Sequence, residues 1–198
     1  YDKVGSELFG QITQLEEYYP SRTEMGILDQ YGSELVEALI GKSVIELGSG
    51  DASKISKLIK HVPEEQLGDM IYYPVDVSAS ALAYTSKEIQ LRFPRLQVKG
   101  IVADFIHHLE DIQVAGPKTI CFFGSTLGNF TTHEAQKLLK SIRNLLQPGD
   151  HLLLGLDRVK SRDVLLSAYN DRKGITALFN LNILQHINSL IGTNFDTS

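Results

Sequence analysis

The stretch Val44-Ile45-Glu46-Leu47-Gly48-Ser49-Gly50 decides the fold of this 198-residue chain. Three apolar residues and one acid, followed by two closely spaced glycines, indicate a buried strand that opens into a tight loop. Glycine reaches backbone angles closed to other residues and lets a ligand approach the main chain. We interpret the stretch as a strand leading into a cofactor-binding loop. A Gly-x-Gly pair alone is equally compatible with a structural turn. The choice between a cofactor-binding loop and a structural turn therefore depends on the rest of the sequence.

The composition favours a globular protein that works on small molecules. Hydrophobic residues make up 42% and charged residues 22% of the sequence, the formal net charge is -5, and no long run of Lys and Arg occurs. A nucleic-acid partner is therefore not expected. Neither a signal peptide nor a membrane span is visible, and Cys121 is the only cysteine, which is typical of a reducing cytoplasm. We expect a cytoplasmic protein without a membrane partner, and the oligomeric state stays open.

From residue 43 onward, strand and helix signals alternate along the chain. Strands are expected over residues 43–47, 71–77, 98–103, 119–123 and 151–156, and helices over residues 53–61, 79–91, 132–146, 163–168 and 177–190. Such alternation predicts an α/β fold with right-handed crossovers, in which helices cover both faces of a mainly parallel sheet. Ligands of such sheets gather at the carboxyl ends of the strands.

Residues 1–42 form an N-terminal helical segment ahead of a Rossmann-like domain over residues 43–198. Apolar spacing predicts a short helix near residues 7–13. Ser21 and Glu24 have the spacing of a capping box that would begin a second helix running to about Ile40, while Pro20 favours an extended Tyr19. We expect this segment to cover the ligand cleft.

Polar residues and glycines follow four of the expected strands. Gly48, Ser49 and Gly50 follow the first, Asp76 and Val77 close the second, Asp104 and Phe105 follow the third, and the loop from Gly124 to Asn129 follows the fourth. A carboxylate can accept hydrogen bonds from both hydroxyls of a ribose, and we assign that role to Asp76. Asp104 would accept from the exocyclic amine of an adenine that lies beside Phe105. These positions predict a cofactor that contains adenosine.

Two adenosine cofactors compete for this loop. A dinucleotide needs a third glycine, in the pattern Gly-x-Gly-x-x-Gly, to bring a helix N-terminus against its pyrophosphate. Here Ser53 stands in that place and Asp51 adds a negative charge. S-adenosylmethionine (SAM) has no phosphate and carries a sulfonium cation, so nearby acids are tolerated. The residues favour SAM, and the absence of a following Gly-Lys-Ser/Thr excludes a P-loop.

The Glu-x-Gly-x-Gly form, with Glu46 two residues before Gly48, resembles class I methyltransferases. A closer resemblance extends over nearly the whole chain, namely to the histidine-specific Nα-methyltransferases of the ergothioneine pathway. These make trimethylhistidine (hercynine), and fungal dimethylallyltryptophan N-methyltransferases are their relatives. The motifs that carry it occur in order over residues 4–9, 18–24, 46–50, 73–78, 123–129, 155–160, 168–171 and 176–180.

The resemblance implies a function and roles for particular residues. The expected enzyme is a SAM-dependent methyltransferase that uses an amino acid as its small-molecule substrate. Asn129 resembles the asparagine that holds the substrate α-amino group, and Tyr19 resembles the tyrosine beside that amine. Phe9, Thr126 and Tyr169 resemble further substrate contacts. The cofactor would be held by Glu46, Gly48, Ser49, Gly50, Lys54, Asp76, Val77, Asp104, Phe105 and Gly124.

The departure from the family lies after Ser198, where members continue with further strands and a lobe that contacts the imidazole of histidine. We therefore expect an exposed sheet edge, and the chain is either a fragment of a longer protein or needs a partner. Specificity for histidine rests on the resemblance alone. Two alternatives stay open: methylation of another amino acid such as a tryptophan derivative, and an S-adenosyl-binding or interaction module without turnover.

No metal site is predicted from the histidines. His107 and His108 are adjacent, and neighbouring positions rarely point at one ion. We interpret both as loop residues.

Overall fold

The computed structural model describes residues 2–197, which fall into two compact units. The sheet unit runs from Glu24 to Asp157, and the terminal unit joins the residues up to Thr23 with those from Arg158 onward. The prediction that residues 1–42 cover the ligand cleft stays a prediction.

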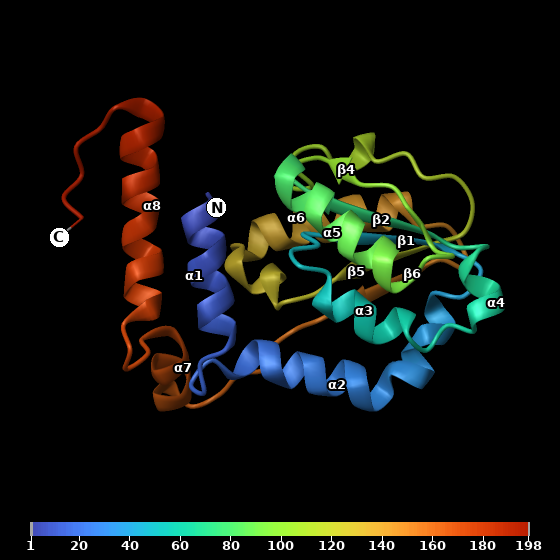
Figure 1. Ribbon diagram of the computed structural model, residues 1–198, viewed down its shortest axis with the longest axis horizontal. Coiled ribbons are helices and arrows are strands. Elements are labelled where there is room, and N and C mark those ends of the chain that lie inside the picture. Colours follow the sequence, from blue (N-terminus) through green and yellow to red (C-terminus); the bar gives the residue numbers. More distant parts are fainter. Residues whose placement is uncertain (1, 198) are drawn as a thin grey trace. The chain divides into compact units, whose positions relative to one another are not determined.

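Within the described residues, six strands form one parallel sheet in the sheet unit (Figure 1). The strands are β1 (Ser43–Leu47), β2 (Ile71–Asp76), β3 (Gln97–Val98), β4 (Ile101–Val102), β5 (Lys118–Phe122) and β6 (His151–Leu154). Their order is β3-β2-β1-β5-β6, and β4 also pairs with β2, at Val75 and Asp76, while β3 pairs with Ile71 and Tyr72. In this register Ser43 lies opposite Ile71 on one side and Lys118 on the other. The predicted parallel sheet is confirmed, with β1 at its centre.

Helices lie on both faces of this sheet, as predicted. Those of the sheet unit are α3 (Ser53–Ile59), α4 (Glu64–Leu67), α5 (Ala79–Arg92) and α6 (Thr132–Leu145). Figure 1 shows α3 and α5 on one face and α6 on the other. Helix α2 (Tyr19–Leu35) begins in the terminal unit and continues into the sheet unit, where the 3₁₀ turn η1 (Val36–Ala38) follows it.

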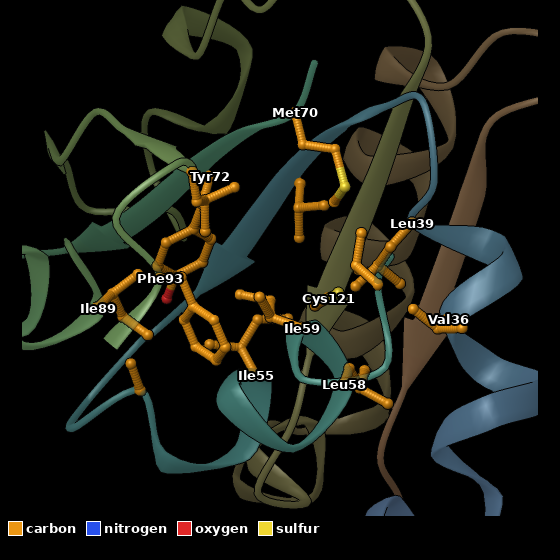
Figure 2. Close-up of a cluster of buried hydrophobic side chains, with 14 of the residues drawn as sticks. Val36, Leu39, Ile55, Leu58, Ile59, Met70, Tyr72, Ile89, Phe93 and Cys121 are labelled. Atoms are coloured by element: carbon orange, nitrogen blue, oxygen red, sulfur yellow. The ribbon is translucent and has the colours of Figure 1, made fainter. Parts of the chain in front are cut away.

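The strands bury alternate side chains on opposite faces, because successive side chains of a strand point to opposite sides. Val44, Tyr72 and Cys121 belong to the cluster under α3 and α5. Ile45 and Ile120 belong to the cluster under α6. Figure 2 shows part of the first cluster, with Ile55, Leu58 and Ile59 of α3 lying over the strands. The residues of both clusters all belong to the sheet unit.

The terminal unit consists of α1 (Lys3–Thr13), α7 (Arg162–Tyr169), α8 (Ile175–Ile191) and the first turn of α2. Helices α1 and α8 pack side by side, although almost the whole sequence separates them (Figure 1). Asp2 caps α1 by accepting from the Gly5 N–H at 2.7 Å, and the same oxygen accepts from Asn182 of α8 at 2.7 Å. One carboxylate thus joins the two helices.

Several predicted elements need correction. The expected strand over residues 98–103 is two short strands, β3 and β4, interrupted at Lys99 and Gly100. A Cβ on Gly100 would be in van der Waals contact with the Ser86 hydroxyl, at 3.4 Å. The expected final strand ends at Leu154 rather than at residue 156, and α4 was not expected.

The expected capping box of α2 is wrong. The helix begins at Tyr19, two residues before Ser21, and Pro20 occupies its first turn, where a missing N–H costs no helical hydrogen bond. The carboxylate of Glu24 is engaged with Gly124 and Lys54 instead. A capping box does occur at α6, between Thr131 and Glu134.

Candidate functional site

The loop after β1 is wound tightly back against β2. Gly48 and Gly50 have φ values of +70° and +53°, and Ala52 has a φ of 54°, all in the left-handed region that favours glycine. The N–H groups of Gly48 and Ser49 both donate to the Val75 carbonyl, at 2.9 and 3.2 Å. The spacing of the glycines therefore produces the sharp turn predicted from the sequence.

The same loop has two features that are typical of a ligand-binding loop. A Cβ on Gly50 would meet nothing within 4 Å, so this part of the main chain faces open space. Ser49 is 6% exposed, and its hydroxyl is buried without a hydrogen-bond partner among residues 2–197. Buried polar groups are normally paired. An unpaired hydroxyl between two glycines of positive φ therefore fits a site that binds a polar ligand.

Asp76 and Asp104 have matching local geometry at the next two strand ends. Asp76 Oδ1 accepts from the Ser78 N–H at 3.0 Å, and Asp104 Oδ1 accepts from the Ile106 N–H at 2.9 Å. In each turn the second oxygen, Oδ2, is not used by that bond. Asp104 Oδ2 lies 4.0 Å from His107 Nε2. Each turn therefore holds a carboxylate that retains hydrogen-bonding capacity.

Phe105 connects the Asp104 turn with the glycine loop. Its ring packs edge-on against Phe122, with centroids 5.5 Å apart, and lies 3.6 Å from where a Cβ on Gly48 would stand. The structure thus brings together Gly48 and Phe105, two residues that the sequence analysis assigned to one cofactor. Val77, assigned to the same cofactor, is 63% exposed directly after β2.

Glu46 lies inside the core rather than on the loop surface. Glu46 is 3% exposed, and its Oε2 is 2.5 Å from the Tyr72 hydroxyl oxygen on the neighbouring strand. Burial raises the pKa of Glu46 to about 8, and the hydrogen bond from Tyr72 offsets only part of this effect. Burial also raises the pKa of the neighbouring Cys121 thiol. A direct contact between Glu46 and a ligand stays a prediction.

Lys54 and Gly124 both contact the carboxylate of Glu24, a residue that was not predicted to belong to the site. Glu24 Oε2 lies 2.7 Å from Lys54 Nζ, and both oxygens of Glu24 accept from the Gly124 N–H, at 3.0 and 2.9 Å. Gly124 has a φ of +81°. Lys54 and Gly124 lie 30 and 100 positions from Glu24 in the sequence, so the local pattern around Glu24 does not indicate these partners.

The loop after β5 carries Thr126 and Asn129 on the 3₁₀ helix η3 (Thr126–Asn129). Thr126 donates its hydroxyl hydrogen to the Phe123 carbonyl at 2.9 Å, and Asn129 is exposed at the end of η3. Ser125, with a φ of 55°, accepts from the Asp157 N–H at 2.9 Å. The loop is therefore held both by its own turn and by the segment that follows β6.

The other predicted substrate residues lie in the terminal unit. Phe9 packs against Tyr18 and Phe179, with ring centroids 6.5 and 6.1 Å away, and Tyr18 packs edge-on against Tyr169 at 5.8 Å. The Lys160 ammonium stands over the ring of Tyr19 at 4.6 Å. The structure brings Phe9 and Tyr169 together through Tyr18, a residue that the sequence analysis did not assign.

The terminal unit also contains a pocket of about 430 Å³ beside this aromatic cluster. It is lined by Lys160, Arg162, Leu165, Leu166, Tyr169 and Asn170. Over residues 2–197, no three His, Cys, Asp or Glu side chains gather in a way that could hold a metal ion. None of the helices described here has the length and apolar content needed to cross a membrane.

Nearly the whole chain is similar to known methyltransferases. The family described as histidine-specific methyltransferases, SAM-dependent, matches over residues 1–198. Histidine N-alpha-methyltransferase of Mycolicibacterium smegmatis is 39% identical over 196 residues, covering 99% of this chain and 61% of that protein. Ergothioneine biosynthesis protein 1 of Neurospora crassa is 33% identical over 200 residues, covering 97% of this chain and 22% of that protein.

A relative with a different named substrate also matches. The 4-dimethylallyltryptophan N-methyltransferase of Claviceps purpurea is 32% identical over 174 residues, covering 84% of this chain and 48% of that protein. The chain spans about 61% of the length of the bacterial relative and less of the fungal ones.

Proposed function

The chain belongs to the family of SAM-dependent, histidine-specific methyltransferases, and we propose on this basis that it methylates the α-amino group of an amino acid. The proposed substrate is L-histidine and the product trimethylhistidine (hercynine), in ergothioneine biosynthesis. The observation that carries the proposal is the family match over the whole chain, together with the glycine loop at the carboxyl end of β1. The single, buried cysteine supports a cytoplasmic location.

The residues at the carboxyl edge of the sheet fit SAM. The unpaired Ser49 hydroxyl and the open space beside Gly50 suit a polar ligand that approaches the main chain closely. Asp76 would accept from the ribose hydroxyls, while Asp104 and Phe105 would hold the adenine. Lys54 would face the carboxylate of the methionine moiety. When bound, the cofactor supplies an electrophilic methyl group on a sulfonium.

Transfer of a methyl group to an amine is a direct displacement, so no nucleophilic side chain is required. The protein contributes alignment of a neutral nitrogen and removal of water. In this proposal the Asn129 side-chain oxygen accepts from the substrate amine and orients it without adding charge. Thr126 lies on the same 3₁₀ helix and would contact the substrate beside Asn129.

Aromatic residues of the terminal unit are proposed as further substrate contacts. Tyr19 would stand beside the amine and stabilise an increasingly methylated ammonium through cation–π attraction. Its ring already faces the Lys160 ammonium at 4.6 Å, which supports a capacity to bind cations. Phe9 and Tyr169 would contact the substrate as well, and we add Tyr18 because it packs against both of them.

The cofactor can be tested separately from the substrate. Titration calorimetry with S-adenosylhomocysteine should show binding to the purified protein and weakened binding to Asp76→Ala. Asp69→Ala, at an exposed position before β2, is the matched control. Absence of binding to folded protein would exclude the cofactor site.

The substrate is tested by incubating the protein with SAM and a mixture of amino acids, followed by mass spectrometry. We expect products with one, two and three added methyl groups on histidine only. A second candidate is a tryptophan derivative, which the fungal relative named for 4-dimethylallyltryptophan favours. Methylation of that substrate would replace histidine in the proposal. Cofactor binding with no product from any amino acid would instead indicate a binding module without turnover.

A further inference from the structure

Glu24 connects three segments of the sheet unit that are distant in sequence. From helix α2, its carboxylate accepts from the Gly124 N–H at the end of β5 and pairs with Lys54 Nζ in the first turn of α3. The side chains of Glu24 and Lys54 are only 15% and 23% exposed. Water and salt therefore screen this ion pair less than an ordinary surface pair.

Gly155, directly after β6, lies against the carboxylate of Glu24. A Cβ on Gly155 would collide with Glu24 Oε1 and lie 3.1 Å from its Cδ. No positive φ requires a glycine at this position. The absence of a side chain at Gly155 therefore leaves room for the Glu24 carboxylate in this position.

We propose that Glu24 is a positioning residue for the amino-acid end of the cofactor. It acts through Lys54 and Gly124 and holds them where the α-amino carboxylate of the ligand binds. This inference rests on the proposed function, because that function makes Lys54 the partner of the ligand carboxylate. The inference goes beyond the proposed function because it assigns a role in the ligand site to Glu24, a residue of helix α2.

The chemistry of lysine explains why a positioning residue is useful here. A lysine ammonium has three donors on a flexible stem. One donor to Glu24 fixes the stem and leaves two for a ligand. Because the side chain is already ordered, the ligand does not lose binding energy in ordering it. The hydrogen bond from Gly124 likewise orders the start of the loop that carries Thr126 and Asn129.

The first test is a double-mutant cycle read by calorimetry with S-adenosylhomocysteine. Glu24→Gln keeps an oxygen that can accept from Gly124 but removes the charge that holds Lys54, and Glu24→Ala removes both. We expect Glu24→Ala to weaken binding about tenfold or more and Glu24→Gln to weaken it less. Glu34→Ala, exposed on the same helix, should bind like the parent.

The second half of the double-mutant cycle tests whether Glu24 acts through Lys54. In a Lys54→Met background, Glu24→Gln should change the affinity by less than about twofold. An equal loss in both backgrounds, or no loss in either, would overturn the proposal. Gly155→Ala should reproduce the loss of Glu24→Ala, and the two effects should not add. Gly26→Ala is its control, because a Cβ there meets nothing within 4 Å.

Two measurements without ligand separate this inference from the proposed function. In Glu24→Ala, hydrogen exchange of the Gly124 amide should accelerate, and Lys54 should be acylated faster by a limiting amount of acetic anhydride. If the parent does not bind S-adenosylhomocysteine, the cofactor proposal fails, and these two readouts still decide whether Glu24 positions Lys54 and Gly124. Unchanged exchange and unchanged acylation would reject the inference.

Discussion

The Glu46 carboxylate and the Tyr72 hydroxyl are 2.5 Å apart between adjacent strands β1 and β2, and both side chains are buried. Glu46 stands two residues before Gly48, the first glycine of the loop. Burial raises the pKa of Glu46 to about 8 from an ordinary value of 4.5. A carboxyl with a raised pKa is held as the neutral acid in the folded protein at neutral pH, where it can share a hydrogen bond with the tyrosine.

The first prediction concerns stability against pH. Between pH 4.5 and about 8 the folded protein keeps the Glu46 proton, while the unfolded chain releases it. The free energy of unfolding therefore falls as pH rises through this window, by up to about 1.4 kcal/mol per pH unit. Glu46→Gln should remove this slope in urea unfolding measured from pH 5 to 8. Glu34→Gln, at an exposed site, should keep the slope; equal slopes in all three proteins would contradict the prediction.

The second prediction uses two glycines with the same backbone requirement. Gly50 and Gly41 have φ values of +53° and +70°, and a Cβ on either would meet nothing within 4 Å. Substitution by Ala should cost each variant roughly 1 to 2 kcal/mol in the free energy of unfolding. Only Gly50→Ala should also weaken S-adenosylhomocysteine binding, by about tenfold or more, because its methyl group occupies the ligand approach. Equal affinities of the two variants would contradict the loop assignment.

The third prediction separates ribose from adenine recognition. Asp76→Asn and Asp104→Asn keep an oxygen for the local turn, so thermal unfolding should change little. Each should weaken S-adenosylhomocysteine binding about tenfold. The parent should bind S-inosylhomocysteine, which lacks the exocyclic amine, less well than S-adenosylhomocysteine. This difference should shrink in Asp104→Asn and persist in Asp76→Asn; the reverse pattern would exchange the two assignments.

The fourth prediction concerns Asp171 in the terminal unit. Its two oxygens accept from the N–H groups of Ile175 and Thr176, at 3.0 and 2.8 Å, at the start of α8. Desolvation alone would raise the pKa of Asp171, but these hydrogen bonds outweigh it and lower the pKa to about 2. The ionised Asp171 carboxylate therefore contributes to the free energy of unfolding above pH 3.8, and this contribution is lost as the pH falls toward 2.

Asp171→Ala should reduce the free energy of unfolding at pH 7 by about 1 kcal/mol, as for other helix caps. Asp171→Asn, which keeps one acceptor oxygen, should lose less. The difference between Asp171→Ala and the parent should narrow as the pH of the unfolding experiment is lowered from 4 toward 2. A difference that is independent of pH would show that the carboxylate charge contributes nothing.

The alternation of apolar strands with helical segments was enough to predict the parallel sheet. Periodicity reports which face of an element is buried, and the covering of both sheet faces follows from it. The break between β3 and β4 at Lys99 and Gly100 was not predicted, because the apolar pattern of this stretch indicates one continuous strand. The start of α2 was also misplaced. Glu24 had the spacing of a local cap, yet its carboxylate binds partners 30 and 100 positions away.

The sequence by itself determined the parallel sheet, the glycine loop and the acids at the strand ends, since these depend on local backbone preferences and on periodicity. The position of Glu24 beside Lys54, the burial of Glu46 against Tyr72 and the placement of Tyr18 between Phe9 and Tyr169 were decided only by the tertiary structure. Each joins residues that are distant in sequence or on different elements. Such contacts depend on how the elements pack, which a local pattern does not encode.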